Sequence, residues 1–143
     1  MAKKGDKKNK IILASGKRRT AVARVRIMES DSNPQFRVNG QLIETWPNEF
    51  AKKVMMEPII LLGDLYKNNL NIKAKVFGGG WMGQAQAVKI ALARALNEYY
   101  GSSQVTAMFN DYDRTWLSGD IRRTEPKKAG GRGARARFQK SYR

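Results

Sequence analysis

The chain has 143 residues, of which 28 are Lys or Arg and 12 are Asp or Glu, and its formal net charge is +16. It contains no Cys and no His, which excludes a disulfide framework and a thiolate-ligated zinc site and removes the commonest general base. No apolar run reaches the roughly 18 residues of a membrane span. The excess of positive charge predicts a polyanionic partner: nucleic acid, an acidic membrane surface or an acidic protein.

The charge is concentrated at the two ends of the chain. Residues 1–26 carry a net charge of +9, residues 27–113 carry −1, and residues 114–143 carry +8. A generally basic surface would spread its charge more evenly. We therefore expect three parts: a basic N-terminal extension over 1–10, a globular α/β domain over 11–118 and an extended RNA-binding tail over 119–143.

The first predicted elements are strands. The apolar run 11–14 fits a short strand, and Ser15-Gly16 is typical of a turn. Residues 20–28 alternate with a period of two, which predicts a half-buried strand with a basic outer face. Its inner face would hold Ala21, Ala23, Val25 and Ile27. Turn-forming residues follow at 30–34, and a further strand over 35–39 ends at the strong turn signal Asn39-Gly40.

A helix is predicted to begin after Asn48, whose side chain is a good N-terminal cap. Three of its side chains should face inward: Phe50, Val54 and Met55. Pro58 is expected to stop or kink this helix, since proline lacks the N–H that an interior position donates. The apolar run 59–62 is expected to be buried, and Gly63-Asp64 to close it.

The pattern becomes clearest between residues 70 and 112. Residues 70–77 alternate as a strand, three glycines follow, and apolar side chains then recur at three- and four-residue spacing over 82–100, as in an amphipathic helix. Gly101 should cap that helix, and Ser102 or Ser103 should start another. The apolar face of this last helix would hold Val105, Met108, Phe109 and Tyr112. This order of elements predicts a two-layer α+β sandwich, with the strand–helix step starting or completing a crossover.

The pattern dissolves after Gly119. The remaining segment has too few bulky apolar side chains to offset its ordering entropy, about 1–2 kcal/mol per residue for the backbone. We expect an extended tail that orders against a partner. The one dense carboxylate group, Asp111 and Asp113, more plausibly caps a helix and pairs with Arg114 than binds a metal. We therefore predict no enzyme activity, no cofactor and no metal site.

Two stretches have the composition of an RNA-binding surface. One leads from a loop into the second strand, where clustered cations repel one another and phosphates would relieve the repulsion; the alternative is a solvated strand edge. Its candidate residues are Lys17, Arg18, Arg19, Arg24 and Arg26. The other is the tail, in which cations alternate with two rings that are able to stack on bases. Its candidates are Arg122, Arg123, Lys127, Lys128, Arg132, Arg135, Arg137, Phe138, Lys140, Tyr142 and Arg143.

The glycines at 78–80 allow two interpretations. Glycines between a strand and a helix could cradle a phosphate at the helix N-terminus. They are also the default residues of a tight turn in which the helix packs close to the sheet. The segment lacks the Lys-Ser/Thr of a P-loop and is not a dinucleotide fingerprint, so the tight turn is favoured.

Several of these motifs together resemble ribosomal protein S9 of the small subunit, the universal uS9 family. They are "SGKRRTAVARVRI", "VNGQLIETW", "KVFGGGWMGQAQAVKIALARAL" and "YDRTWLSGDIRRTEPKKAGGRGARARFQKSYR". The resemblance covers residues 11–143, and the ending is similar to the archaeal and eukaryotic branch.

The resemblance implies a ribosomal protein S5 domain 2-like fold with a basic C-terminal tail. It also implies a place in the head of the small ribosomal subunit in the cytoplasm, bound to small-subunit rRNA and neighbouring ribosomal proteins. In the family the tail approaches the anticodon stem-loop of the peptidyl-site (P-site) tRNA. Carried over by position, the tRNA contacts would be Phe138, Lys140, Tyr142 and, above all, Arg143, with the remaining candidates of both stretches on rRNA.

Two other classes of function compete with this interpretation. S5 domain 2-like folds also occur in small-molecule kinases, but here the glycine turn has no phosphate-binding Ser or Lys. The other class is a cationic membrane-surface or chromatin-type binder. A membrane binder needs an amphipathic basic helix, whereas these cations lie on loops, a strand and a glycine-rich tail. We therefore expect no membrane partner.

Overall fold

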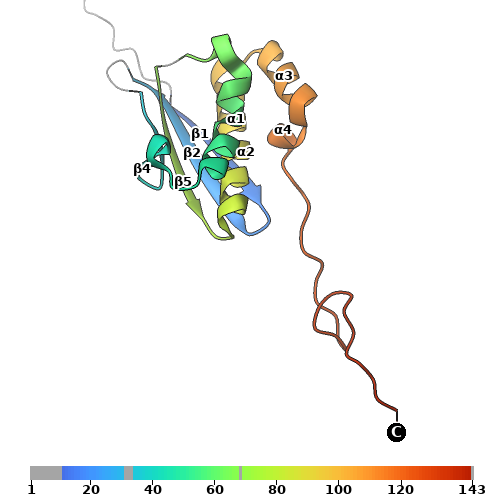
Figure 1. Cartoon of the computed structure of the whole chain (residues 1–143). Coiled ribbons are helices and arrows are strands. Elements are labelled where there is room, and N and C mark those ends of the chain that lie inside the picture. The colour runs from blue at the N-terminus through green and yellow to red at the C-terminus, as the bar shows by residue number, and fades with distance from the viewer. Residues whose placement is uncertain (1–10, 31–33, 68, 143) are drawn as a thin grey trace, which may run out of the picture.

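The computed structural model of the protein describes residues 11–30, 34–67 and 69–142, and it forms two layers with a long C-terminal tail (Figure 1). One layer is a sheet of β1 (Ile11–Arg18), β2 (Ala21–Glu29), β3 (Phe36–Val38), β4 (Gln41–Leu42) and β5 (Leu70–Phe77). The helices are α1 (Glu49–Leu62), α2 (Trp81–Tyr100), α3 (Ser103–Asp113) and α4 (Thr115–Ser118), with 3-10 turns η1 (Ile43–Thr45) and η2 (Gly63–Leu65). The expected N-terminal extension, 1–10, lies outside the described residues, as does part of the expected turn at 30–34.

The strand order is β1-β2-β5-β3-β4, and every pairing is antiparallel except that of β3 with β5. Parallel neighbours need a crossover, and α1 provides it between β3 and β5. Helix α2 then lies across β1 and β2, so that α1 and α2 cover the same face of the sheet (Figure 1). The predicted two-layer α+β architecture is confirmed.

The core lies between the sheet and these helices. The inner face predicted for β2 is buried, and so is the alternate set Leu70, Ile72, Ala74 and Val76 of β5. Helix α2 begins and ends as predicted to within one residue, and Gly101 caps it in the left-handed conformation, with φ 57°. Ser102 is the cap of α3, and its side chain accepts a hydrogen bond from the Gln104 amide.

Gly16 is not part of a turn, contrary to the sequence-based expectation. It lies inside β1, and the turn follows at Arg19-Thr20, where Arg19 has a φ of 53°. A Cβ atom on Gly16 would lie 2.4 Å from the Ala87 carbonyl oxygen and 2.5 Å from the Ala91 amide nitrogen. The glycine is therefore required because α2 approaches the strand backbone closely, a tertiary contact that a local turn signal cannot distinguish from a turn.

The predictions for α1 were partly wrong. Pro58 does not stop the helix but lies inside it, with its ring fully buried, and residues 59–62 form its last turn. This run is not buried throughout as expected, because Ile60 is 67% exposed and only Leu62 is fully buried. Phe50 is 57% exposed rather than inward-facing. The buried stripe runs through Ala51, Val54, Met55, Pro58 and Leu62, at three- and four-residue spacing, and Phe50 lies one position outside it.

Helix α4 and its buried indole were not predicted. Trp116 has no exposed surface, and its ring lies 5.5 Å from that of Phe109, which the α3 pattern did predict as buried. Tyr112 was expected on the same apolar face, but it is 59% exposed and only tilts against Trp116, at 4.9 Å between ring centroids. Burial of Trp116 fixes the place where the tail leaves the domain.

The contact at Gly16 gives a stability prediction. Gly16→Ala should lower the free energy of unfolding by about 1–3 kcal/mol, because the new methyl group overlaps helix backbone atoms that have no rotamer to adopt. Urea denaturation followed by circular dichroism measures the change. Gly133→Ala is the control, since no atom lies within 4 Å of its added Cβ, and it should change stability by less than about 0.5 kcal/mol. An unaffected Gly16→Ala protein would contradict the close packing.

Candidate nucleic-acid interface

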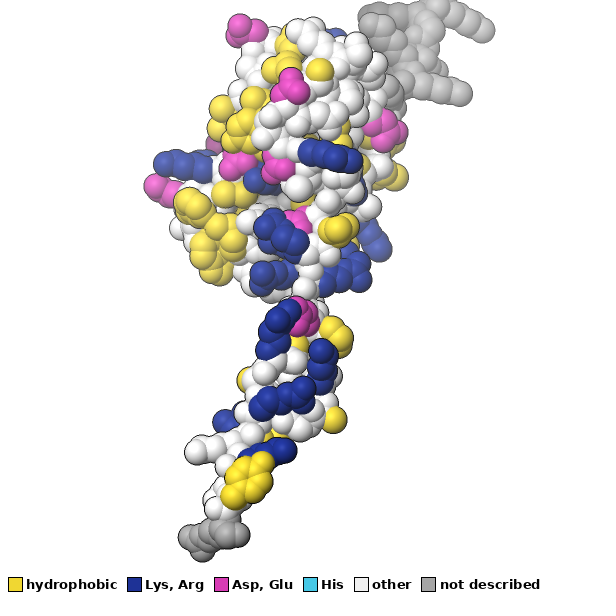
Figure 2. Space-filling view, turned by 90° about the vertical axis from the view of Figure 1, so that its right-hand side faces the viewer, with side chains coloured by type: hydrophobic (Ala, Val, Ile, Leu, Met, Phe, Trp, Pro, Cys, Tyr) yellow, Lys and Arg dark blue, Asp and Glu magenta, His cyan; other side chains and the backbone are white. Residues whose placement is uncertain are grey.

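The end of β1 and the turn that follows it project two exposed cations, Lys17 and Arg19, beside the first residues of the tail. Together with Arg123 and Thr124 they line an open groove, which we call the hairpin–tail groove. Figure 2 shows Lys and Arg side chains gathered at the base of the globular part, where the tail departs, and along the tail itself. Two cationic stretches more than 100 residues apart in sequence thus meet at one place.

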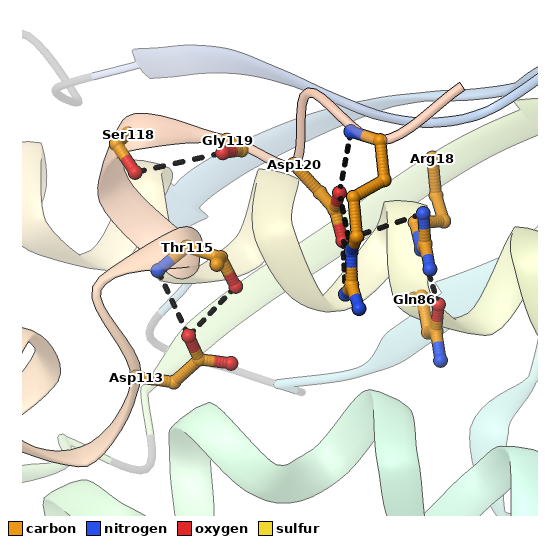
Figure 3. A network of polar contacts seen from close by, with 8 residues as sticks. Arg18, Gln86, Asp113, Thr115, Ser118, Gly119 and Asp120 are labelled. Atoms are coloured by element: carbon orange, nitrogen blue, oxygen red, sulfur yellow. Dashed lines mark hydrogen bonds and ion pairs between the residues drawn. The ribbon is translucent and has the colours of Figure 1, made fainter.

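Arg18, the neighbour of these cations, is turned inward. Its Nε donates to the Gln86 side chain of α2 at 2.8 Å, and its Nη1 lies 3.3 Å from an Asp120 carboxylate oxygen. The Arg18 and Asp120 side chains are only 12% and 6% exposed. Figure 3 shows this carboxylate between Arg18 and the tail. Arg18 therefore ties the strand to the tail root and is less available to a phosphate than Lys17 or Arg19.

The Asp120 carboxylate is held from both sides. The Arg122 guanidinium donates to it, with its shortest contact at 2.6 Å, and the Arg122 backbone amide donates at 2.9 Å. The hydrogen bonds from the Arg122 side chain are the largest influence on the pKa of Asp120, which falls from 3.8 to about 2 although burial opposes the shift. The carboxylate is therefore ionised at any pH near neutrality. Its bonds to Arg122 and Arg18 hold the first residues of the tail against β1.

A second arginine fixes the same region from α2. Arg94 donates from Nε to the Leu117 carbonyl at 3.0 Å and from Nη1 to the Ser15 carbonyl at 2.9 Å. A Cβ on Gly119, whose φ is 91°, would lie 2.7 Å from the Arg94 guanidinium. Strand β1, helix α4 and the tail root are thereby joined through one helix side chain.

The carboxylate group near the end of α3 caps a helix but does not pair with Arg114 as expected. Asp113 instead accepts from the amide and the hydroxyl of Thr115, at 2.8 and 2.7 Å, at the start of α4 (Figure 3). In the part of the chain that the structure describes, no group of three or more acidic side chains could hold a metal ion.

The tail has no helix or strand in its described part, but it is not extended throughout. Arg135 pairs with Glu125 through two contacts of 3.0 and 2.8 Å, and the Phe138 amide donates to the Gly130 carbonyl at 3.2 Å. These bonds close the loop seen in Figure 1 below the domain. The Arg132 guanidinium lies 6.0 Å from the centre of the Phe138 ring.

The candidate site residues thus fall into groups. Three are ion-paired within the chain: Arg18, Arg122 and Arg135. Two others, Arg24 and Arg26, lie on the sheet face opposite the helices, and the remaining described candidates are exposed on the turn or tail. Phe138 and Tyr142 expose 54% and 88% of their surface, and Arg143 lies outside the described residues.

Sequence reasoning missed the groups that orient these cations. Asp120 and Glu125 are the only acids after Asp113, and an isolated acid in a basic run was an available signal for an internal ion pair. Arg94 gave no such signal, because its acceptors are backbone carbonyls brought close by the fold alone.

The glycines at 78–80 support the tight-turn interpretation. A Cβ on Gly78, whose φ is 74°, would lie 2.6 Å from the Thr20 carbonyl oxygen, and one on Gly79 would lie 3.0 Å from the Ala21 methyl group. The segment packs against the β1–β2 turn, and Gln84 donates to the Gly78 carbonyl. Close backbone contact accounts for these two glycines.

Among the described residues, no helix is long and apolar enough to cross a membrane.

Comparison with known proteins agrees with the fold. The five-stranded sheet and its helices are consistent with the S5 domain 2-like α+β class. The sequence profile of the family described as Ribosomal protein S9/S16 matches residues 16–143. The chain belongs to this family.

Curated relatives extend the similarity over nearly the whole chain. The chain is 47% identical to small ribosomal subunit protein uS9 of Desulfurococcus amylolyticus, over 95% of both sequences. It is 45% identical to that of Halobacterium salinarum, over 90% of this chain and 96% of the relative, and 44% identical to that of Pyrobaculum aerophilum, over 94% and 92%. All three relatives are archaeal and are named as ribosomal proteins, which are structural components rather than enzymes.

The tail root gives a prediction that depends on pH. Asp120→Asn should lower the free energy of unfolding at pH 7 by about 1.5–3 kcal/mol, the range for hydrogen bonds to a charged group. The wild-type carboxylate has a lower pKa in the folded than in the unfolded protein. Its contribution to stability is therefore complete above about pH 5 and is lost progressively as the pH falls through the folded pKa of about 2. Urea titrations from pH 7 to pH 2 should show the two proteins converging.

The exposed Asp111 provides the matched control for this experiment. Asp111→Asn should change stability by less than about 0.5 kcal/mol at pH 7. If the Asp120 and Asp111 variants were equally stable at pH 7, the paired carboxylate would not be holding the tail root.

Proposed function

We propose that this protein is a structural constituent of the small ribosomal subunit that binds small-subunit rRNA through its exposed cations. The observation that carries the proposal is the meeting of the β1–β2 turn and the tail root in one groove, where Lys17, Arg19 and Arg123 stand without an acid among the groove residues. Phosphates would neutralise these cations and release counterions, which makes such binding strong at low salt. Family membership supports the same conclusion.

Three arginines that contact the tail root or the strand beside it give the groove its shape. Arg18, Arg122 and Arg94 are used to hold the tail root against β1 and α2. An interface whose cations are fixed before binding loses less side-chain and loop entropy on association. We infer that Arg18 and Arg122 act mainly as positioning residues, and that the unpaired cations of the groove meet the RNA.

The tail would then follow RNA away from the domain. Its described cations include Lys127, Lys128, Arg132, Arg137 and Lys140, and all of them are on its surface. Glycines lower the bulk of the backbone, so that such a segment is able to pass through narrow spaces between RNA helices. Phosphate contacts of this kind carry no base information, so we expect binding to depend on RNA shape.

The end of the tail is the proposed contact with P-site tRNA. It carries two exposed rings, Phe138 and Tyr142, beside Lys140, and the sequence ends at Arg143. Contact with the anticodon stem-loop through phosphates would be insensitive to tRNA identity. Partners would be rRNA, neighbouring small-subunit proteins and P-site tRNA, in the ribosomes of the cytoplasm.

The groove is tested by removing two of its charges. The plot of log affinity for small-subunit rRNA against log salt concentration has a negative slope. Lys17→Gln/Arg123→Gln should make this slope less steep by about 1.4–1.8, the value for two lost phosphate contacts. Filter binding between 50 and 300 mM salt measures the slope. Lys53→Gln/Lys67→Gln removes the same charge from exposed positions remote from the groove. An equal effect of both pairs would show that only net charge matters.

The tail end is tested by deletion of residues 138–143. The shortened protein should keep its cooperative unfolding transition, because no residue of this segment belongs to the hydrophobic core of the described residues. Small subunits assembled with it should bind P-site tRNA more weakly, with a flatter salt dependence.

A second variant separates charge from the length of the tail. Lys140→Gln/Arg143→Gln keeps both rings and should reproduce most of the loss in tRNA binding. If the deleted protein failed to enter the subunit, the segment would be an assembly element and the tRNA contact would be refuted. Wild-type tRNA affinity in subunits carrying the double variant would show that charge does not supply the contact.

A further inference from the structure

Among the residues that the structure describes, no helix or loop layer covers one face of the sheet. Helices α1 and α2 pack on the side that holds the buried residues of β2 and β5, and the alternate side chains point the other way. On β2 and β5 these are Arg24, Arg26, Lys73 and Lys75, all exposed, and Arg37 of β3 is half-buried beside them. We call these five cations, with the strands that bear them, the open sheet face.

The register places these cations directly opposite one another. Arg26 pairs with Lys73, and Lys73 pairs in turn with Arg37. Two residues farther along each strand, Arg24 of β2 pairs with Lys75 of β5. Neighbouring strands lie about 4.8 Å apart, and like charges directly opposite on a sheet are destabilising. The free protein therefore carries three pairs of mutually repelling cations on one surface.

Nothing in the described strands neutralises this charge. Their residues on the open sheet face include no acid, and none of the five cations takes part in an ion pair within the described chain. Arg26 donates to the Met28 sulfur and Arg37 donates to the Gln35 amide oxygen. Such contacts hold a guanidinium in place but leave its charge uncompensated.

The surroundings indicate what kind of polyanion fits. The aromatic side chain at one end of the face, Phe77, is 53% exposed, and the Arg24 guanidinium lies 5.9 Å from its ring centre. The middle of the face is cationic rather than aromatic, so it offers no platform on which unpaired bases would stack. Arg and Lys in a two-dimensional array suit phosphates. At its other margin Leu13, 70% exposed, lies opposite Arg26.

We propose that the open sheet face, centred on Arg26, Lys73 and Arg37, is an additional surface that binds the phosphate backbone of structured ribosomal RNA. This face adjoins the hairpin–tail groove. Val22 lines that groove together with Lys17, and Val22 pairs with Lys17 on one side and with Phe77 of the open sheet face on the other. The protein would thus hold RNA along a continuous track from β3 to the tail root. The inference rests on the proposed rRNA binding and adds Arg37, Lys73 and Lys75 to its residues.

The test uses two lysines that lie outside the groove and the tail. The full-length Lys73→Gln/Lys75→Gln protein is compared with Lys53→Gln/Lys67→Gln, which has the same charge and the same type of substitution on exposed residues. The first pair should make the salt dependence of binding to small-subunit rRNA less steep, by about 1.4–1.8 in the slope of log affinity against log salt. It should also abolish hydroxyl-radical protection at nucleotides that the Lys17→Gln/Arg123→Gln protein still protects. The second pair should leave the footprint unchanged.

Thermal unfolding of the free proteins gives an independent readout. Removing like-charge neighbours should raise the melting temperature of Lys73→Gln/Lys75→Gln at low salt, and the gain should vanish at about 1 M salt, where charges are screened within about 3 Å. A variant that bound RNA more weakly because it was unfolded would instead melt earlier.

The outcomes separate this inference from the proposed function. If the wild-type protein did not bind rRNA, both would fall. If wild type bound and Lys73→Gln/Lys75→Gln had an unchanged slope and footprint, the open-face inference alone would be overturned. If that variant kept its RNA affinity and footprint but no longer entered the subunit, the face would dock an acidic protein segment, which also overturns it.

Discussion

The close contact between α2 and the β1–β2 hairpin is the constraint on which the rest of this structure depends. The helix reaches the strand backbone at Gly16, and small side chains such as Ala87 and Ala91 make the approach possible. Dispersion and hydrophobic burial both fall off steeply with a gap between layers, so the small residues are a condition for the core. The same contact sets the direction of the hairpin and therefore the position of its cations.

The polar contacts around the tail root follow from that placement. Once α2 lies on β1, Gln86 is within reach of Arg18, and Arg94 is within reach of the Ser15 and Leu117 carbonyls. Asp120 then finds two guanidinium partners in a nearly buried position. A buried carboxylate is tolerable only with such partners. These contacts fix the direction in which the tail leaves the domain, although none of its described residues belongs to the hydrophobic core.

The distribution of charge on the molecule is a compromise between folding and binding. Pairs such as Arg18 with Asp120 and Arg135 with Glu125 fix the chain upon itself. Most other cations of the hairpin, the open sheet face and the tail form no ion pair among the described residues. Self-repulsion of this kind lowers the stability of the free protein. It also means that a polyanion is bound with release of counterions and relief of repulsion together.

The sequence by itself determined the features that depend on local periodicity and composition. Alternation over residues 21–28 and 70–77 predicted two strands and their buried faces, and the spacing of apolar residues predicted α2 with its cap at Gly101. The separation of charge into the two ends was also readable directly, because charge does not depend on the fold.

Only the tertiary structure decided which of these features meet. Gly16 resembled a turn residue until α2 was placed against it, and Pro58 resembled a helix end until its ring was buried. Arg18 counted among the RNA-binding candidates, yet contact with Asp120, 102 residues away, turns it inward. The physical reason is common to all three: a neighbour distant in the sequence supplies or removes contact energy at a position, and local pattern carries no information about that neighbour.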